Sequence, residues 1–170
     1  MKKVIIIGCP GSGKTTFAIK LHEALGLPLY HLDAIWHKPD RTHISRDEFD
    51  ERITELFKLD EWIIDGNYSR TVEGRLIACD TVFLFDLPTD VCLAGAIERL
   101  GKGRYDMPWI DRELDPKLRQ EIEEFKGKKL PEIYHLIEKH RQNKDVIIFK
   151  SRKEAESFLI RIKKCHNELG

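Results

Sequence analysis

The residues best suited to chemistry lie close together near the N-terminus. Between Gly8 and Thr15 the sequence GCPGSGKT matches the phosphate-binding loop pattern G-x-x-x-x-G-K-[ST] at every fixed position. Glycines let a backbone wrap a phosphate with its N–H groups, and a helix that begins at Lys14 adds unpaired donors and partial positive charge. Lys14 can reach the β and γ phosphates of a nucleotide, and the Thr15 hydroxyl is the expected protein ligand of Mg²⁺. The residues expected to bind the nucleotide are Gly8, Pro10, Gly11, Ser12, Gly13, Lys14, Thr15 and Thr16.

The residues before this loop favour a ligand site over a plain glycine-rich turn. Four consecutive aliphatic residues, 4–7, precede Gly8, which is typical of a strand buried on both faces of a parallel sheet. A strand, a glycine-rich loop and a helix in this order are the setting in which the pattern binds phosphate. A turn without a ligand is the alternative, and the match of three glycines and Lys-Thr makes it the weaker one.

Composition describes an ordinary globular chain. Its 170 residues suffice for one domain over 1–170, with 41% hydrophobic and 34% charged residues. Lys plus Arg and Asp plus Glu both number 29, so no basic excess favours direct nucleic-acid or membrane binding. No apolar run is long enough for a membrane span. Four cysteines without a C-x-x-C pair indicate reduced thiols in the cytoplasm and no zinc site, and the oligomeric state stays open.

Hydrophobic periodicity and turn signals predict strands that alternate with helices. Apolar runs predict five strands, at 4–7, 28–32, 62–64, 81–85 and 146–149. Amphipathic spacing, capping boxes and prolines predict helices over 14–25, 45–57, 69–77, 89–100, 115–125, 131–137 and 151–162, with loops at 34–42 and 101–115. This alternation indicates an α/β fold with a parallel sheet covered on both faces.

Carboxylates follow three of the expected strands, at Asp33, Asp65 and Asp86. Ligands of parallel sheets bind at the carboxyl ends of the strands, so these side chains are expected at the same edge as the phosphate loop. Asp86 precedes Leu-Pro, where it can simply cap the next helix, and it is left out of the catalytic set.

Several segments resemble a known family of nucleotide-binding proteins. The chain is similar to the topology modulation proteins (FlaR-type), P-loop NTPases related to adenylate kinase and shikimate kinase, in GCPGSGKTT, YHLDAIW, WIIDGNYSRT, TVFLFDLP and IIFKSRKEAESFL. The resemblance spans roughly residues 3–160. It implies a three-layer fold of the nucleoside-monophosphate-kinase type, with a five-stranded parallel sheet in the order 2-3-1-4-5 and a short lid at about 101–114.

The resemblance also implies roles for single residues. ATP and Mg²⁺ would be held between Gly8 and Thr15, and Asp65 falls where relatives orient magnesium-bound water. Arg70 resembles a phosphate-binding arginine, although DGNYSR is one residue longer than the Asp-Gly-Phe-Pro-Arg of nucleotide kinases and lacks its proline. Arg99 resembles the arginine that leads into the lid and touches donor phosphates.

Two departures from adenylate kinases bear on the substrates. Gly95 stands where those enzymes place an arginine against the adenine. The Thr-Gly-Asp-Met/Leu-Arg stretch that seats their nucleoside monophosphate has no counterpart after the second strand. The acceptor is therefore not expected to be AMP.

Asp33 is the candidate general base. It would accept a proton from a hydroxyl acceptor or, as the corresponding position in shikimate kinases suggests, contact magnesium-bound water; a turn carboxylate is the plain alternative. A charge at this edge must be hydrated, paired or metal-linked, which favours a functional role. Lys14, Asp33 and Arg99 form the expected catalytic set.

Other side chains have two possible interpretations each. Arg104 and Arg119 could close over phosphates or make surface ion pairs. Trp36 and Tyr68, with Asn67, flank the expected acceptor pocket, where the aromatic rings could contact a substrate or only pack the loop. The histidines at 31, 37 and 43 match no zinc-site spacing, so a metal role is not expected for them.

The sequence thus predicts an ATP- and Mg²⁺-dependent phosphotransferase acting on a small acceptor. A nucleotide-dependent regulatory protein, linked to DNA topology by the family's name, is the rival. A plain ATPase is the third alternative.

Overall fold

Five parallel strands form a sheet in the order β2-β3-β1-β4-β5, which confirms the predicted fold class and strand order. The computed structural model describes residues 1–168 and the side chains of residues 1–164. The strands are β1 (Lys3–Gly8), β2 (Leu29–His31), β3 (Trp62–Asp65), β4 (Thr81–Phe85) and β5 (Asp145–Phe149). The helices are α1 (Lys14–Leu25), α2 (Leu32–Trp36), α3 (Arg46–Phe57), α4 (Ser69–Ala78), α5 (Thr89–Glu98), α6 (Pro116–Lys139) and α7 (Arg152–Glu168).

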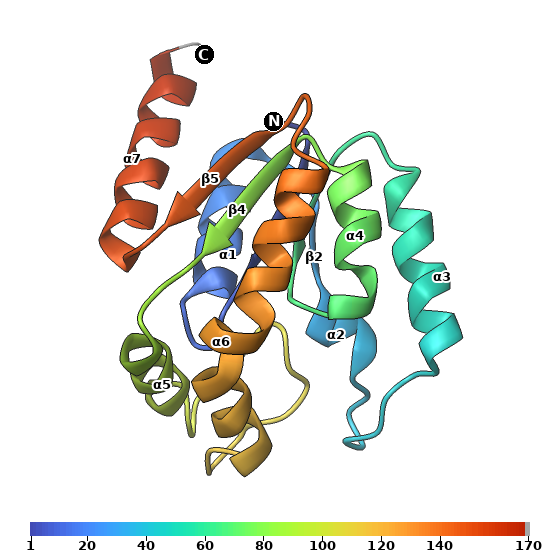
Figure 1. Cartoon of the computed structure of the whole chain (residues 1–170), viewed down its shortest axis with the longest axis vertical. Helices are drawn as coiled ribbons and strands as arrows, with labels where there is room; N and C mark the ends of the chain where they lie inside the picture. The colour runs from blue at the N-terminus through green and yellow to red at the C-terminus, as the bar shows by residue number, and fades with distance from the viewer. Residues whose placement is uncertain (169–170) are drawn as a thin grey trace.

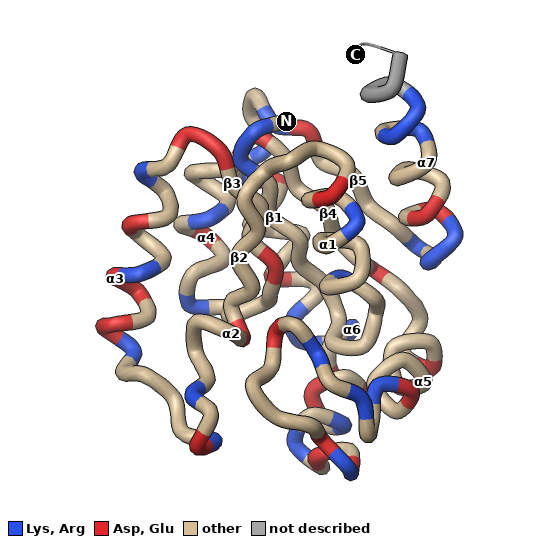
Figure 2. The backbone as a smooth tube through the Cα atoms, turned by 180° about the vertical axis from the view of Figure 1, so that it is seen from behind, with Lys and Arg blue, Asp and Glu red and all other residues tan. Residues whose placement is uncertain are grey.

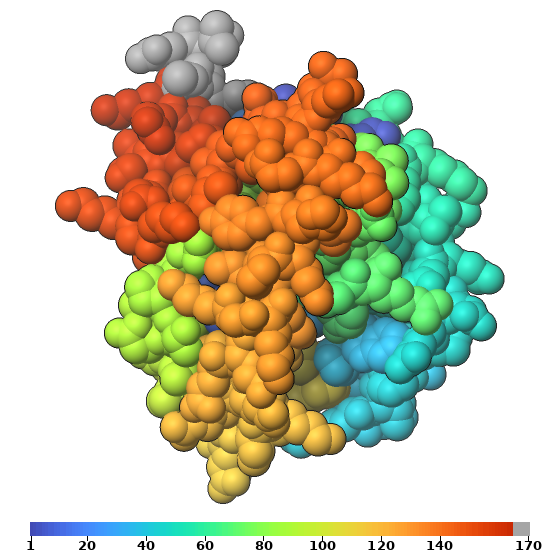
Figure 3. All heavy atoms as spheres, viewed as in Figure 1, coloured from blue at the N-terminus to red at the C-terminus, as the bar shows by residue number. Residues whose placement is uncertain are grey.

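Helices cover both faces of the sheet, as Figure 1 shows. On one face α1 packs against α7, and on the other α4 packs against α3 and α6. The side chains of α6 cover the middle of the second face in Figure 3. In Figure 1 the arrow of β4 points down toward the side of α5 and that of β5 toward the lower end of α7.

The central strands are apolar because both of their faces are covered. Every residue of β3 and β4 is buried, as are residues 4–8 of β1, whereas the edge strands β2 and β5 are mostly half-buried. In the sheet Ile6 lies opposite Asp65, and Gly8 lies opposite Phe85. The phosphate loop and the residues after β3 therefore leave the sheet side by side.

Two predicted elements are wrong in detail. Residues 34–42 are not all loop, because the five-residue helix α2 begins directly after β2 and places Asp33 in its first turn. Burial of Leu32 and a hydrogen bond from the His37 N–H to the Asp33 carbonyl (2.9 Å) hold this turn.

The second error concerns the helix after Asp115. Two helices were expected, yet α6 runs from Pro116 to Lys139 with Pro131 inside it. An internal proline removes one helical hydrogen bond, which favours a break. Here Leu130 and Ile133 continue the buried stripe that contains Ile122, and this tertiary packing outweighs the local preference.

Basic and acidic residues are equal in number, and neither kind dominates the helices on the surface. In Figure 2, basic and acidic segments are interspersed along α3 and α7. No helix of the described chain combines the length and the apolarity that a membrane crossing requires. Cys9, Cys79 and Cys92 are free, buried thiols, while the side chain of Cys165 lies outside the described residues.

Helix α5 packs directly on the backbone of the phosphate loop. A Cβ added to Gly11 would lie 2.1 Å from the Cys92 carbonyl oxygen. A Cβ added to Gly95 would lie 2.2 Å from the Gly11 carbonyl oxygen and 2.2 Å from the Arg152 guanidinium. The absence of a side chain at residue 95 is therefore what lets the helix, the loop and Arg152 meet.

Replacing Gly95 with alanine should destabilise the protein. We expect Gly95→Ala to lower the free energy of unfolding by about 1–3 kcal/mol, the usual cost of overpacking. Gly127→Ala is the matched control, since Gly127 also lies within a helix but has open space around its Cβ. The control should raise the free energy of unfolding by up to about 1 kcal/mol through helix propensity. Thermal or urea unfolding measures both, and equal behaviour of the two variants would contradict this close packing.

Candidate active site

A cavity of about 1170 Å³ lies at the carboxyl edge of the sheet. Its walls come from the phosphate loop, α2, the turn after β3, the end of α5, the segment 99–115 between α5 and α6, and the start of α7. Pockets for one small molecule usually measure about 300–1000 Å³. This cavity is therefore large enough to hold two small ligands together.

The phosphate loop forms one wall of the cavity, and we call this side of the cavity the donor half. Gly11 (φ 79°) and Gly13 (φ 102°) adopt left-handed conformations that favour glycine. The Lys14 ammonium donates to the Cys9 carbonyl oxygen at 2.8 Å, so it lies within the curl of the loop. Burial lowers the pKa of Lys14, while the charge of Asp65 opposes this shift. The Ser12 hydroxyl is buried and has no hydrogen-bond partner among the described residues, which leaves it available to a ligand.

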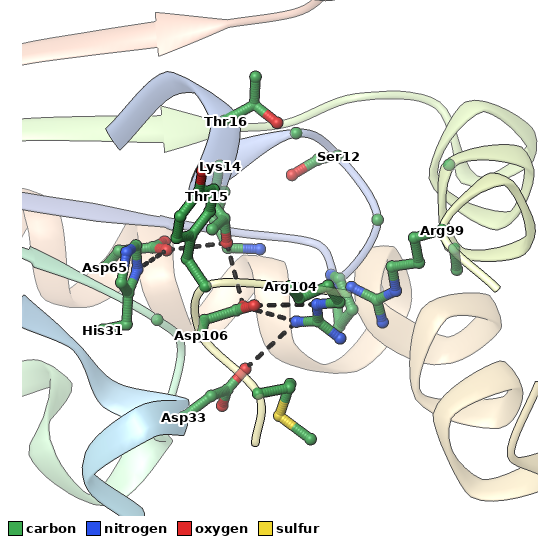
Figure 4. A pocket seen from close by; sticks show the side chains of 18 of the residues that line it. Ser12, Lys14, Thr15, Thr16, His31, Asp33, Asp65, Arg99, Arg104 and Asp106 are labelled. Carbon is green, nitrogen blue, oxygen red and sulfur yellow. Dashed lines mark hydrogen bonds and ion pairs between the residues drawn. The ribbon is translucent and has the colours of Figure 1, made fainter. Parts of the chain in front are cut away.

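Thr15 and Asp65 meet beside this wall, as Figure 4 shows. The Thr15 hydroxyl donates to Asp65 Oδ2 at 2.9 Å, and His31 Nδ1 lies 3.0 Å from the same oxygen. Asp65 is only 4% exposed, and its Oδ1 has no partner in the described structure. Burial opposes protonation of His31, but the hydrogen bond and charge of Asp65 outweigh it and raise the pKa of His31. His31 is thus a hydrogen-bond partner of the buried Asp65 carboxylate. The spacing of the three histidines in the sequence did not reveal this role.

Arg75 holds the turn that follows β3. Its side chain is fully buried and donates to the carbonyl oxygens of Gly66 (2.7 Å), Asn67 and Tyr68 (3.4 Å). Asn67 Oδ1 in turn accepts from the N–H of Gly8 at 3.0 Å, and this bond ties the turn to the start of the phosphate loop. Sequence reasoning missed Arg75, because no motif marks an arginine in a helix that binds the backbone carbonyls of the preceding turn.

Asp33 lies on the wall opposite the phosphate loop, which we call the acceptor half of the cavity. This wall also contains His31, His37, Tyr68 and Trp109. The Tyr68 hydroxyl donates to Asp33 Oδ1 at 2.8 Å, and Arg104 Nη2 lies 3.8 Å from Oδ2. Loss of hydration raises the pKa of the Asp33 carboxyl, while the Tyr68 hydrogen bond opposes the shift and nearby Asp106 adds to it. A carboxylate with a raised pKa is a better proton acceptor than an ordinary aspartate.

The segment 99–115 contributes a bidentate ion pair. Arg104 Nε donates to Asp106 Oδ1 at 2.9 Å, and Arg104 Nη2 donates to Oδ2 at 2.5 Å. Asp106 is 3% exposed and also accepts from the Thr15 hydroxyl at 3.3 Å. Burial raises the pKa of Asp106, but Arg104 outweighs it, so the pKa is lowered. Sequence reasoning missed Asp106; its position two residues after Arg104 was the available signal.

Two further arginines approach the donor half. Arg99 lines the cavity beside Arg104 (Figure 4) and forms no ion pair with any described residue. Burial and the charge of Arg104 lower its pKa. Arg152 donates from Nη2 to the Gly11 carbonyl oxygen at 3.0 Å. Arg152 follows the last strand, and this position at the carboxyl edge of the sheet could have drawn attention to it.

The structure does not bring every expected residue to the cavity. Arg70 pairs with Asp50 at 2.6 Å on the surface and does not line the cavity, because the first turn of α4 directs it toward α3. Trp36 also lies outside the lining; it stacks on His43 with ring centroids 4.4 Å apart and so packs the loop. Gly8 and Arg119 do not line the cavity either. Arg119 forms an ion pair with Glu123 one turn further along α6.

The cavity contains the other expected residues. The structure places Asp33, Asp65, Asn67, Tyr68, Arg99 and Arg104 along its walls, together with residues 10–16. No group of three or more His, Cys, Asp or Glu side chains in the described chain can hold a metal ion by itself. A metal here would need oxygen ligands from a bound substrate as well.

Removing the Arg75 guanidinium should unfold the turn after β3. We expect Arg75→Met to lower the free energy of unfolding by at least about 1–3 kcal/mol, the cost of one buried carbonyl without a donor. Arg70→Met on the same helix is the control and should change stability little, because solvent screens its ion pair. Urea unfolding of both variants checks this, and an Arg75 variant as stable as the control would contradict the role of this side chain.

No model of a known protein family matches the chain, and no curated protein sequence matches it. Among solved structures, a gluconokinase from Sinorhizobium meliloti 1021 superposes with a TM-score of 0.54 and 14% identity, over 99% of this chain and 93% of that one.

Two shikimate kinases are similar to the same extent. That of Bacteroides thetaiotaomicron has a TM-score of 0.54 and 17% identity, over 95% of this chain and 96% of its own. That of Acinetobacter baumannii, in complex with shikimate, has a TM-score of 0.56 and 17% identity, over 97% and 92%. Identities this low establish the fold alone: the chain has the α/β fold of the P-loop kinases.

Proposed function

We propose that this protein is a phosphotransferase that uses ATP and Mg²⁺ to phosphorylate a hydroxyl group of a small acceptor. The observation that carries the proposal is that one cavity contains both a phosphate loop and a partly exposed carboxylate, Asp33, on the opposite wall. A plain ATPase needs neither the second wall nor its carboxylate. The likeness in fold to sugar and shikimate kinases supports the proposal.

The donor half suits a nucleoside triphosphate. The α1 N-terminus, Lys14 and Arg99 offer N–H donors and positive charge to the phosphates. Thr15 and Asp65 supply oxygen ligands, directly or through water, and the unpartnered Asp65 Oδ1 fits such a ligand set. Magnesium, when bound there, would neutralise phosphate charge.

The acceptor half suits the incoming hydroxyl. The acceptor oxygen would attack the γ-phosphorus as its proton passes to Asp33, and the bond from that phosphorus to the bridging oxygen would break, releasing ADP. Lys14 and Arg99 would stabilise the charge on the transferring group. Segment 101–114 would act as a lid that excludes water, which otherwise competes with the acceptor.

Charge at the acceptor half favours an acceptor without a carboxylate or phosphate of its own. Asp33 lies there with Asp106 close by, and the arginine beside them, Arg104, already pairs with both. Arg70, the expected anion-binding residue, lies outside the cavity. A neutral or cationic hydroxyl compound avoids repulsion from these carboxylates.

The resemblance to topology modulation proteins is compatible with the same site. A regulatory protein of that kind would bind nucleotide with little turnover. We favour the kinase because Asp33 has a role in phosphoryl transfer and none in nucleotide retention alone.

A matched pair of acceptors tests the proposed function. Mg²⁺-ATP is supplied with D-glucitol or with D-gluconate, a pair of hydroxyl acceptors that differ in one anionic group. We expect acceptor-dependent ADP release and a phosphorylated product by mass spectrometry, with the neutral member of the pair preferred. Equal ADP release without acceptor would indicate an ATPase. Nucleotide binding without ADP release, together with salt-dependent retention on duplex DNA, would favour the regulatory rival.

Asp33 provides the mechanistic test. We expect Asp33→Asn to lower kcat by about 10²- to 10⁴-fold, the usual contribution of a general base, with little change in KM for ATP. Asp47→Asn is the control, since Asp47 is exposed on α3 away from the cavity. If Asp33→Asn changes only the acceptor KM, Asp33 binds the acceptor and does not take its proton.

A further inference from the structure

We propose that Asp106 is a second carboxylate of the magnesium–nucleotide site, facing Asp65 across the Thr15 hydroxyl, so that metal binding and docking of segment 99–115 are coupled. The inference rests on the proposed function, because it concerns the same nucleotide. It assigns a metal role to a residue that neither the phosphate-loop motif nor the turn after β3 contains.

The first support is geometric. The Thr15 hydroxyl donates to Asp65 Oδ2 at 2.9 Å and to Asp106 Oδ2 at 3.3 Å, as the dashed lines in Figure 4 show. A hydroxyl has only one hydrogen, so it cannot fully satisfy two carboxylates. Two anions from distant parts of the chain thus converge on the side chain that the motif assigns to Mg²⁺.

The second support is an unsatisfied buried atom. Asp65 is 4% exposed and Asp106 is 3% exposed, so neither charge is well hydrated. Asp65 Oδ1 has no hydrogen-bond partner among the described residues. Buried carboxylates need pairing, donors or a metal. A divalent cation with its bound water would supply both charge and donors at this point.

The ligand chemistry fits magnesium. Mg²⁺ prefers six oxygen ligands, keeps several waters and usually takes one or two protein carboxylates together with substrate phosphates. One hydroxyl and two carboxylates, with the rest supplied by phosphate and water, form such a set.

A purely structural role for Asp106 is the competing explanation. Its bidentate pair with Arg104 could serve only to orient that arginine toward Asp33 or toward phosphate. The two roles differ in their dependence on metal. An orienting role affects nucleotide affinity equally with and without the ion, whereas a metal role affects only the metal-dependent part.

Metal binding to the ADP complex distinguishes them. Mn²⁺ is titrated into the protein with ADP and free Mn²⁺ is followed by electron paramagnetic resonance; ADP affinity is measured separately in EDTA. We expect Asp106→Asn to raise the Kd for Mn²⁺ about 10- to 100-fold, the range usual when a residue that supports a metal site is lost. The affinity for ADP in EDTA should stay within about twofold of the unmodified protein. Asp47→Asn is the matched control, because it makes the same chemical change at an exposed residue of α3 that does not line the cavity.

Amide hydrogen exchange of the unmodified protein gives a second test that does not depend on the folding of a variant. Exchange over residues 102–110 should slow with Mn²⁺ and ADP and not with ADP in EDTA. Unchanged Mn²⁺ affinity in Asp106→Asn, equal loss of ADP affinity with and without metal, or metal-independent exchange would each overturn the inference. Failure of the unmodified protein to bind ADP would overturn the proposed function as well, which separates the two failures.

Discussion

The hydrogen bond between Thr15 and Asp65 joins the start of α1, directly after the phosphate loop, to the end of β3. Pairing of β1 with β3 places Ile6 opposite Asp65, so the phosphate loop and the carboxylate leave the sheet together. Both strands are buried between helices, and a charge at their end cannot reach bulk water. Asp65 therefore needs partners, and Thr15, His31 and the charge of Lys14 supply them from two other segments. Much of the remaining site is arranged around this buried carboxylate.

The distribution of charge within the cavity follows from the same constraint. The donor half presents Lys14, Arg99 and Arg152 beside the α1 N-terminus, which suits a polyanion. The carboxylates gather on the other side, where Arg104 pairs with both Asp106 and Asp33. The chain is neutral overall, and yet its cavity is divided into a cationic wall and an acidic one. For the proposed reaction this division separates the nucleotide phosphates from the acceptor.

Local sequence patterns identified the elements well where one face or both faces are buried. The apolar runs of β1, β3 and β4 are found where they were predicted, as are the starts of the helices α1, α3 and α6 to within one residue. Predictions were wrong where packing overrules a local preference, as at Pro131 inside α6 and in α2 after β2. Arg70 is an instance of the same limit at the site: the resemblance suggested that it binds phosphate, but α4 directs its side chain toward Asp50.

Short-range spacing and the direction of parallel strands are enough to predict the strand–helix alternation, the phosphate loop and the edge of the sheet at which Asp65 lies. The side chains that complete the site can be identified only once the elements are packed together. Asp106 from segment 99–115 and Arg152 from α7 reach Thr15 and Gly11 through contacts between residues far apart in the chain, and Arg75 from α4 holds the turn after β3. Such contacts leave no periodic signal, since burial and a free hydrogen-bonding group become visible only once the elements are packed.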